Sequence, residues 1–156
     1  MKQAFSALLV LLLAAPTALA QNDVDALAGT WVALQSRVFA SEGDTLAVPT
    51  AQVLVLALDD DALRGTQCIL MGEADWEEGE ANARGTMGFE SPVEGLAGGV
   101  DGALVRARVA FLPGPAGGKR REFDVTVLPS GDRLRLTPAF ESAYGPLEMW
   151  RVPQLD

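Results

Sequence analysis

The sequence predicts an all-β protein, an antiparallel up-and-down barrel of eight strands, and three observations support this prediction. Short runs in which apolar and polar residues alternate follow one another along the chain, as expected for strands with one buried face. Clusters of glycine, proline and aspartate separate these runs. No helical repeat interrupts them. A closed barrel removes exposed sheet edges, although a two-sheet β-sandwich would give the same alternation.

The first 20 residues have the features of a secretory signal peptide. Lys2 supplies a positive start, residues 7–15 are apolar, and residues 18–20 have the small-x-small pattern of a signal-peptidase site. The apolar run is shorter than the roughly 20 residues that span a bilayer, so we expect no membrane insertion after cleavage. The compact signal indicates a bacterial protein that is periplasmic or secreted. Residues 21–156 are then expected to form a single domain.

Eight short runs carry the strand pattern, and the segments between them carry turn or loop chemistry. The runs are residues 30–39, 52–58, 63–71, 83–90, 104–111, 122–127, 133–136 and 147–152. The first run alternates imperfectly near Gln35, where we expect a bulge. The second is apolar at consecutive positions, which is typical of a strand buried on both faces.

Turn residues divide these runs. Three aspartates at 59–61 predict one hairpin turn, and the Pro-Ser-Gly-Asp segment 129–132 predicts another. The polar segment 41–50 and the glycine- and proline-rich segment 91–102 are expected to be loops. Consecutive hairpins favour an up-and-down order of strands.

Composition excludes most catalytic and metal-binding chemistry. The chain has no histidine and a single cysteine, Cys68, so the commonest general base and most transition-metal ligands are missing. An internal disulfide is impossible, and the apolar neighbours of Cys68 indicate a small core residue. Carboxylate chemistry remains, but no spacing selects one pair among the 21 acidic residues. We therefore expect a non-enzyme without cofactor or metal.

Charge argues against nucleic acid as a partner. Without the signal peptide the chain carries 11 basic and 21 acidic side chains, a net charge of −10, which repels phosphate backbones. The acidic segment 73–80 surrounds Trp76. It could dock a basic protein partner or bind calcium, although it lacks the spacing of a calcium loop; an acidic surface loop is the simpler interpretation. The Lys119-Arg120-Arg121 cluster could bind an anion or be an exposed hairpin end.

The segment Leu27-Ala28-Gly29-Thr30-Trp31 resembles the Gly-x-Trp signature that begins the first strand of the calycin superfamily, which includes the lipocalins and avidin-like proteins. The resemblance implies a barrel in which Trp31 closes one end. It also implies that a basic residue near the last strand, here Arg151, packs across the tryptophan. Gly29, Trp31 and Arg151 would then be structural residues. The lipocalin disulfides are impossible in this chain.

Two functions follow as expectations. In the first, the barrel interior binds a small apolar ligand through Trp31 and the residues expected to point inward. These residues are Met87, Phe89, Val105, Val109, Phe123, Val125, Leu134 and Leu136. The same side chains could instead fill a core. In the second, the protein is a protein-binding module of the cell envelope, such as an inhibitor of a secreted enzyme, that uses acidic loops or the 91–102 segment.

Overall fold

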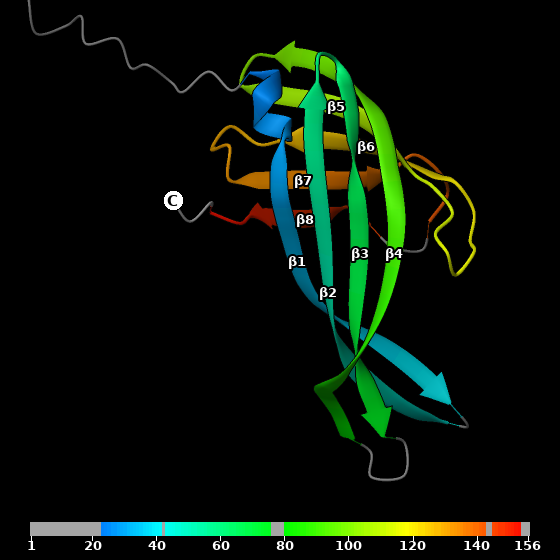
Figure 1. The fold of residues 1–156 in the computed structure, drawn as a ribbon. Helices are drawn as coiled ribbons and strands as arrows, with labels where there is room; N and C mark the ends of the chain where they lie inside the picture. The colour runs from blue at the N-terminus through cyan, green and yellow to red at the C-terminus, as the bar shows by residue number, and fades with distance from the viewer. Residues whose placement is uncertain (1–22, 42, 76–79, 143–144, 154–156) are drawn as a thin grey trace, which may run out of the picture.

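The fold is all-β, and its strands close into a barrel. The computed structural model describes residues 23–41, 43–75, 80–142 and 145–153, so the expected signal peptide lies outside the described residues. Eight antiparallel strands follow one another around the barrel in up-and-down order (Figure 1). The predicted barrel is confirmed, and the β-sandwich alternative is not the fold.

Four long strands are followed by four short ones. A 3-10 helix, η1 (Val24–Leu27), precedes them. The strands are β1 (Gly29–Ser41), β2 (Asp44–Asp59), β3 (Ala62–Asp75), β4 (Glu80–Asp101), β5 (Leu104–Phe111), β6 (Arg121–Val127), β7 (Arg133–Pro138) and β8 (Leu147–Arg151). The longest, β4, has 22 residues, whereas β8 has five.

The long strands extend past the barrel. Figure 1 shows β1–β4 running lengthwise and β5–β8 running across behind them. Pairing between β1 and β8 is confined to Trp31 and Val32, and β4 pairs with β5 only from Val93 onward. The remaining parts of β1–β4 therefore pair with one another but not with β5–β8. We call this part of the sheet the extension.

Several elements differ from the expectation. Most of 41–50 lies in β2 and most of 91–102 lies in β4, so the loops predicted there are wrong. The bulge predicted near Gln35 is also wrong, because Gln35 pairs with Thr50 in an unbroken register. The two predicted hairpin turns, after β2 and after β6, are confirmed.

The core fills the interior of the barrel. Its largest fully buried side chains are Leu27, Trp31, Leu54, Leu63, Val105, Val109, Val125, Val127, Leu134, Leu136 and Met149. Alternation along each strand places them on one face, as β5 illustrates. Burial of an aliphatic or aromatic side chain stabilises a fold by about 1.5–3 kcal/mol. Packing can therefore replace disulfides here.

The interior also holds polar side chains, and Cys68 is not among the core residues. Thr50, Gln52 and Gln67 are buried, and no buried polar side-chain atom of the described residues lacks a hydrogen-bond partner. Because Gln67 faces the interior, its neighbour Cys68 lies on the outward face and is half-buried. The core position predicted for Cys68 is therefore wrong.

Candidate functional site

A tryptophan and an arginine close one end of the barrel. Trp31, at the start of β1, is completely buried. Its indole Nε1 donates a hydrogen bond of 3.2 Å to the carbonyl oxygen of Leu27 in η1. The guanidinium carbon of Arg151, in β8, lies 4.2 Å from the centroid of the Trp31 ring. The structure thus brings together Trp31 and Arg151, the two residues that the resemblance implied would meet.

Arg151 also binds the backbone around it. Its Nε donates to the Gly131 carbonyl oxygen at 3.0 Å, and Nη1 and Nη2 donate to those of Ala28 and Ala26 at 2.7 and 2.5 Å. Burial lowers the pKa of Arg151 from its ordinary value, and an arginine side chain stays charged at neutral pH in proteins. A single guanidinium therefore ties together the first and last parts of the barrel.

Gly29 makes room for this guanidinium. Its φ is +134°, a conformation that side chains rarely adopt, and a Cβ there would lie 2.6 Å from Nη1 of Arg151. The Gly-x-Trp spacing thus has a physical basis. Gly29 has no side chain and leaves space for the guanidinium of Arg151, and the indole of Trp31, two residues later, packs against that guanidinium. The end of the barrel beside η1 is sealed.

The inward-facing residues proposed as ligand contacts are packed against one another. Trp31, Val105, Val109, Val125, Leu134 and Leu136 each expose 2% or less of their surface. A side chain that borders a space as large as a water molecule keeps accessible surface, so this part of the interior is filled. Phe123 is partly buried at the edge of this core.

Phe89 does not point into a core, and the side chain of Met87 lies outside the described residues. Phe89 is 38% exposed, so the prediction that it lines a cavity or fills the core is wrong. Its alternation within β4 is as expected, but pairing with β5 begins only at Val93. Phe89 pairs with Ile69 of β3, but it lies before the part of β4 that pairs with β5, so β5 does not flank it.

The other end of the barrel carries a row of aromatic side chains. The rings of Phe111 and Phe123 lie 4.6 Å apart, and those of Phe123 and Phe140 meet edge to face at 5.5 Å. Phe111 is buried, Phe123 is partly buried and Phe140 is 42% exposed. The row thus leads from the core to the surface. Figure 1 shows the loops that join β5 to β6 and β7 to β8 on the same side of the barrel.

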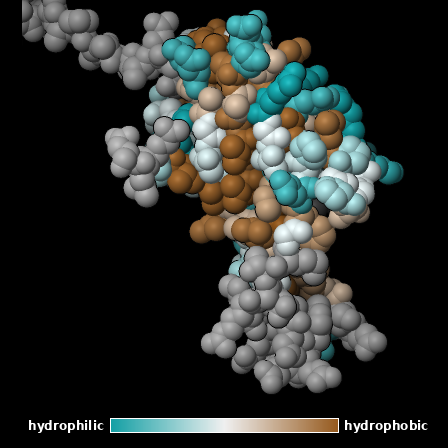
Figure 2. Space-filling view, in the orientation of Figure 1, coloured by the Kyte–Doolittle hydropathy of each residue, from teal (hydrophilic) through white to brown (hydrophobic). Residues whose placement is uncertain are grey.

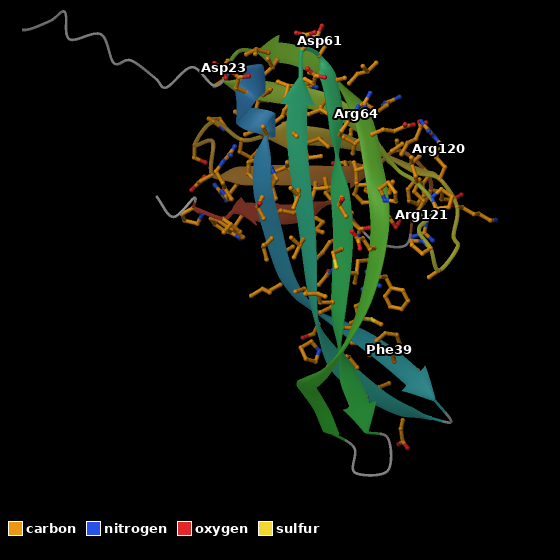
Figure 3. All side chains as sticks on the ribbon, viewed as in Figure 1. Asp23, Phe39, Asp61, Arg64, Arg120 and Arg121 are labelled. Carbon is orange, nitrogen blue, oxygen red and sulfur yellow. The ribbon has the colours of Figure 1, made fainter. Side chains whose placement is uncertain are left out.

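A surface pocket of about 420 Å³ opens beside Phe140. It is lined by Lys119, Arg120, Arg121, Glu122, Ala139 and Phe140. We call it the mouth pocket. Figure 3 shows Arg120 and Arg121 close together on this side of the barrel. The sequence singled out the basic cluster but missed Phe140, because that residue follows the last alternating position of β7 and carries no pattern of its own.

The basic side chains of the mouth pocket differ in their pairing. Arg120 binds Glu94 at 2.6 Å and lies 3.5 Å from Glu122. The hydrogen bond to Glu94 raises the pKa of Arg120. Lys119 and Arg121 form no ion pair within the described part of the chain. Two of the three cations are therefore available to an anion.

Neither metal chemistry nor a membrane helix is visible in the described residues. They contain no group of three potential metal-ligating side chains and no helix long and apolar enough to cross a membrane. All side chains of the acidic segment 73–80 lie outside the described ones, so the calcium and basic-partner hypotheses stay predictions.

No protein-family model, curated protein or solved structure matches this chain. The class of protein is therefore defined by its architecture, a small antiparallel barrel of eight strands with one sealed end and a basic, aromatic pocket near the other.

Proposed function

We propose that this protein is an exported, calycin-like barrel that binds a small amphiphilic ligand, with an apolar body and an acidic head group, without catalysis. The observation that carries the proposal is the mouth pocket, where the exposed ring of Phe140 lies beside Lys119 and Arg121. The volume falls within the range of about 300–1,000 Å³ that is usual for small-molecule sites.

The ligand body is placed at the mouth rather than deep in the barrel. The inward side chains near Trp31 are fully buried, so a ligand there would have to displace them, and close-packed cores resist such displacement. Phe140 exposes apolar surface that a ligand can cover, and the ring of Phe123 packs edge to face against the ring of Phe140. We therefore propose a ligand at the edge of the core, whereas the sequence led us to expect one in the barrel interior.

An acidic head group follows from the charge of the pocket. The mature chain carries a net charge of −10, and the acidic excess lies within residues 21–101, whereas residues 102–156 hold eight basic and six acidic side chains. Within this more basic part of the chain, Lys119 and Arg121 are cations at the mouth pocket that form no ion pair among the described residues. Arginine can bind a carboxylate, sulfate or phosphate through two parallel hydrogen bonds, and lysine adds a mobile point charge.

A titration with matched probes tests this function. Octanoate and 1-octanol share an apolar chain and differ in the acidic group, and backbone NMR shifts of the mature protein report where each binds. We expect octanoate to shift signals around Phe140 and 1-octanol to bind more weakly. Lys119→Glu combined with Arg121→Glu should weaken octanoate binding at least about tenfold, the effect of 1.4 kcal/mol.

Two further variants, one of them a control, separate the effect of charge from that of the apolar contact with Phe140. Arg106→Glu changes an exposed arginine on β5 that pairs with Asp101, and it should leave octanoate binding intact. Phe140→Ala should weaken both probes. The proposal fails if octanoate does not bind, if the charge reversal at Lys119 and Arg121 has no effect, or if the shifted signals cluster around Val125 and Leu134 instead.

A protein-binding module is the second candidate function, and one feature of the surface favours it. The outward face of β1 and β2 carries a band of apolar side chains, including Leu34 and Val55 (Figure 2). The 91–102 segment no longer supports this candidate as a loop, because it belongs to β4. Native mass spectrometry of protein purified from its own periplasm discriminates: a small bound molecule supports the first function, and a bound protein supports the second.

A further inference from the structure

Strand β1 leaves the barrel with an unpaired edge. On the β8 side, the carbonyl of Thr30 accepts a hydrogen bond of 2.8 Å from Val152 N–H. Backbone groups of alternate residues point to the same side of a strand, so those of Leu34, Ser36 and Val38 also point to this side. Pairing with β8 has ended by then, and no other described strand pairs there.

The register with β2 supports this assignment. Ser36 pairs with Pro49, and proline has no N–H to donate. The pair is therefore one without hydrogen bonds between β1 and β2, which leaves the N–H and C=O of Ser36 directed at the open edge. The edge thus offers three N–H and three C=O groups at successive alternate residues.

Apolar side chains border this edge. Leu34 is 82% exposed and Val38 is 68% exposed, and both lie on the outward face because Trp31 and Ala33 face the core. Exposed hydrophobic residues on a long unpaired edge favour the addition of another strand. Figure 3 shows this part of the sheet, ending near Phe39, standing away from the barrel.

The edge of β4 is different. Its Pro92 carbonyl accepts a hydrogen bond of 2.9 Å from Leu112 N–H. The loop after β5 then approaches so closely that a side-chain carbon at Gly114 would overlap the Glu90 carbonyl oxygen. This loop covers β4 next to the barrel, whereas the described part of the chain offers no such cover to β1.

We propose that the open edge of β1 pairs with the same edge of a second copy, antiparallel and centred on Ser36. In this register Leu34 lies opposite Val38 of the other copy, and Val38 lies opposite its Leu34. Both exposed apolar residues are then covered on one face. Each of the three opposed pairs exchanges two hydrogen bonds, so the two edges satisfy each other.

Charge is compatible with a second copy as the occupant. Between Ala33 and Ser41 the strand carries one charged residue, Arg37, and no carboxylate. The Ser36-centred register sets Arg37 opposite Gln35 of the other copy. It therefore avoids two directly opposed arginines, which would be destabilising. The net charge of −10 on each mature chain opposes association at longer range. Added salt therefore strengthens the dimer by screening that repulsion.

Hydrogen exchange over a concentration series tests the pairing on the mature protein. Sedimentation velocity measures the dimer, and the amide protons of Leu34, Ser36 and Val38 should exchange more slowly as the dimer forms. Those of Gln35 and Arg37, which already bond to β2, should change little. A protein that stays monomeric at all concentrations and in high salt overturns the proposal, as does protection at other strands.

Variants locate the interface. Ser36→Pro removes the central donor without affecting a β1–β2 hydrogen bond, and Leu34→Lys places a charge at the edge; each should raise the dimer dissociation constant at least about tenfold. The control is Leu96→Lys, which changes a leucine that is 65% exposed on β4, and it should leave dimerisation unchanged. Dimerisation that survives Leu34→Lys overturns the proposal. If Ser36→Pro does not fold, the exchange pattern of the wild type still decides.

Discussion

Arg151 connects parts of the chain that are more than 100 residues apart. Three of its nitrogens donate to carbonyl oxygens before β1 and in the β6–β7 turn, and its charge lies over the Trp31 ring. A cation on an indole contributes about 0.5–2 kcal/mol. Because lysine is a point charge and cannot reach three acceptors in a planar fork, arginine suits this position.

Replacement of Arg151 by methionine should destabilise the barrel. The variant loses three charged hydrogen bonds and the contact with Trp31 while it keeps a long apolar side chain. We expect the free energy of unfolding to decrease by about 2–4 kcal/mol. The stability of the Arg151→Lys variant should lie between that of the methionine variant and that of the wild type. Urea denaturation followed by tryptophan fluorescence measures both.

The matched control for Arg151 is another arginine of the barrel. Arg106 pairs with Asp101 at 3.1 Å, and both side chains are more than half exposed. Exposed pairs contribute about 0–1 kcal/mol, so Arg106→Met should change stability little. A loss of similar size in the two variants would contradict the role given to Arg151.

Single residues also show how far alternation predicts burial. It placed Val105, Val125 and Leu134 correctly in the core, because each lies on a strand with another strand opposite. It failed for Phe89, where the face is correct but the facing strand has ended. Alternation gives the side of a strand, whereas burial depends on which strands overlap along the barrel axis, and that information is not local.

At the level of elements, β4 shows how tertiary context overrides local propensity. Glycine and proline in 91–102 predicted a loop, but β4 continues through this segment and pairs on both sides. A register shift between Ala97 and Gly99 accommodates the irregularity. Hydrogen bonds to the two neighbouring strands, β3 and β5, stabilise the extended conformation more than the local preference of glycine and proline for turns destabilises it. Gly95 allows β4 and β5 to approach closely, whereas Gly99, with φ +96°, lies at the register shift.

Gly95 should therefore not tolerate a side chain. A Cβ there would lie 2.9 Å from Cα of Val109 on β5, and closer still to the Arg108 carbonyl oxygen. Because these are backbone atoms, relief requires the strands to separate. We expect Gly95→Ala to lower the free energy of unfolding by about 2–4 kcal/mol, measured by urea denaturation.

Gly88, on the same strand, is the control. An added Cβ would meet only the Leu70 side chain, at 3.6 Å, which is ordinary van der Waals contact. Gly88→Ala should be neutral or slightly stabilising, since alanine reduces the entropy of the unfolded chain. If Gly95→Ala and Gly88→Ala change the free energy of unfolding equally, the close approach of β4 and β5 does not explain the glycine at position 95.

For the whole molecule, the sequence predicted the class of the fold but not its proportions. Eight alternating runs and their turns predicted an antiparallel all-β fold, because consecutive hairpins pair with their neighbours. The preference for a barrel over a sandwich came from the removal of exposed edges on closure and from the Gly-x-Trp resemblance. The extension arises where β1–β4 outlast β5–β8, so it depends on strand lengths that glycine and proline obscured. Residues from both the β5–β6 loop and the β7–β8 loop line the mouth pocket. No pattern in either loop alone predicts that Phe140 and Lys119 lie on one surface.

Closure of the barrel depends on β8, the shortest strand. It pairs with β7 from Leu136 to Arg133 and with β1 at only two positions. Glu148 of β8 lies 2.8 Å from Arg135 and 3.8 Å from Arg133, both on β7. The hydrogen bond from Arg135, assisted by both positive charges, lowers the pKa of Glu148 below its ordinary 4.5.

This shift makes the β7–β8 seam sensitive to acid. A carboxylate with a lowered pKa binds fewer protons in the folded state than in the unfolded state, so its stabilising effect is present above pH 4.5 and is lost as the pH falls below that value. A double-mutant cycle with Arg135→Gln and Glu148→Gln isolates the pair. The coupling free energy from urea denaturation should be favourable at neutral pH and should vanish at acidic pH, once Glu148 is protonated in the folded state. A coupling that stays constant with pH would mean that the two side chains stabilise the seam through packing and not through charge.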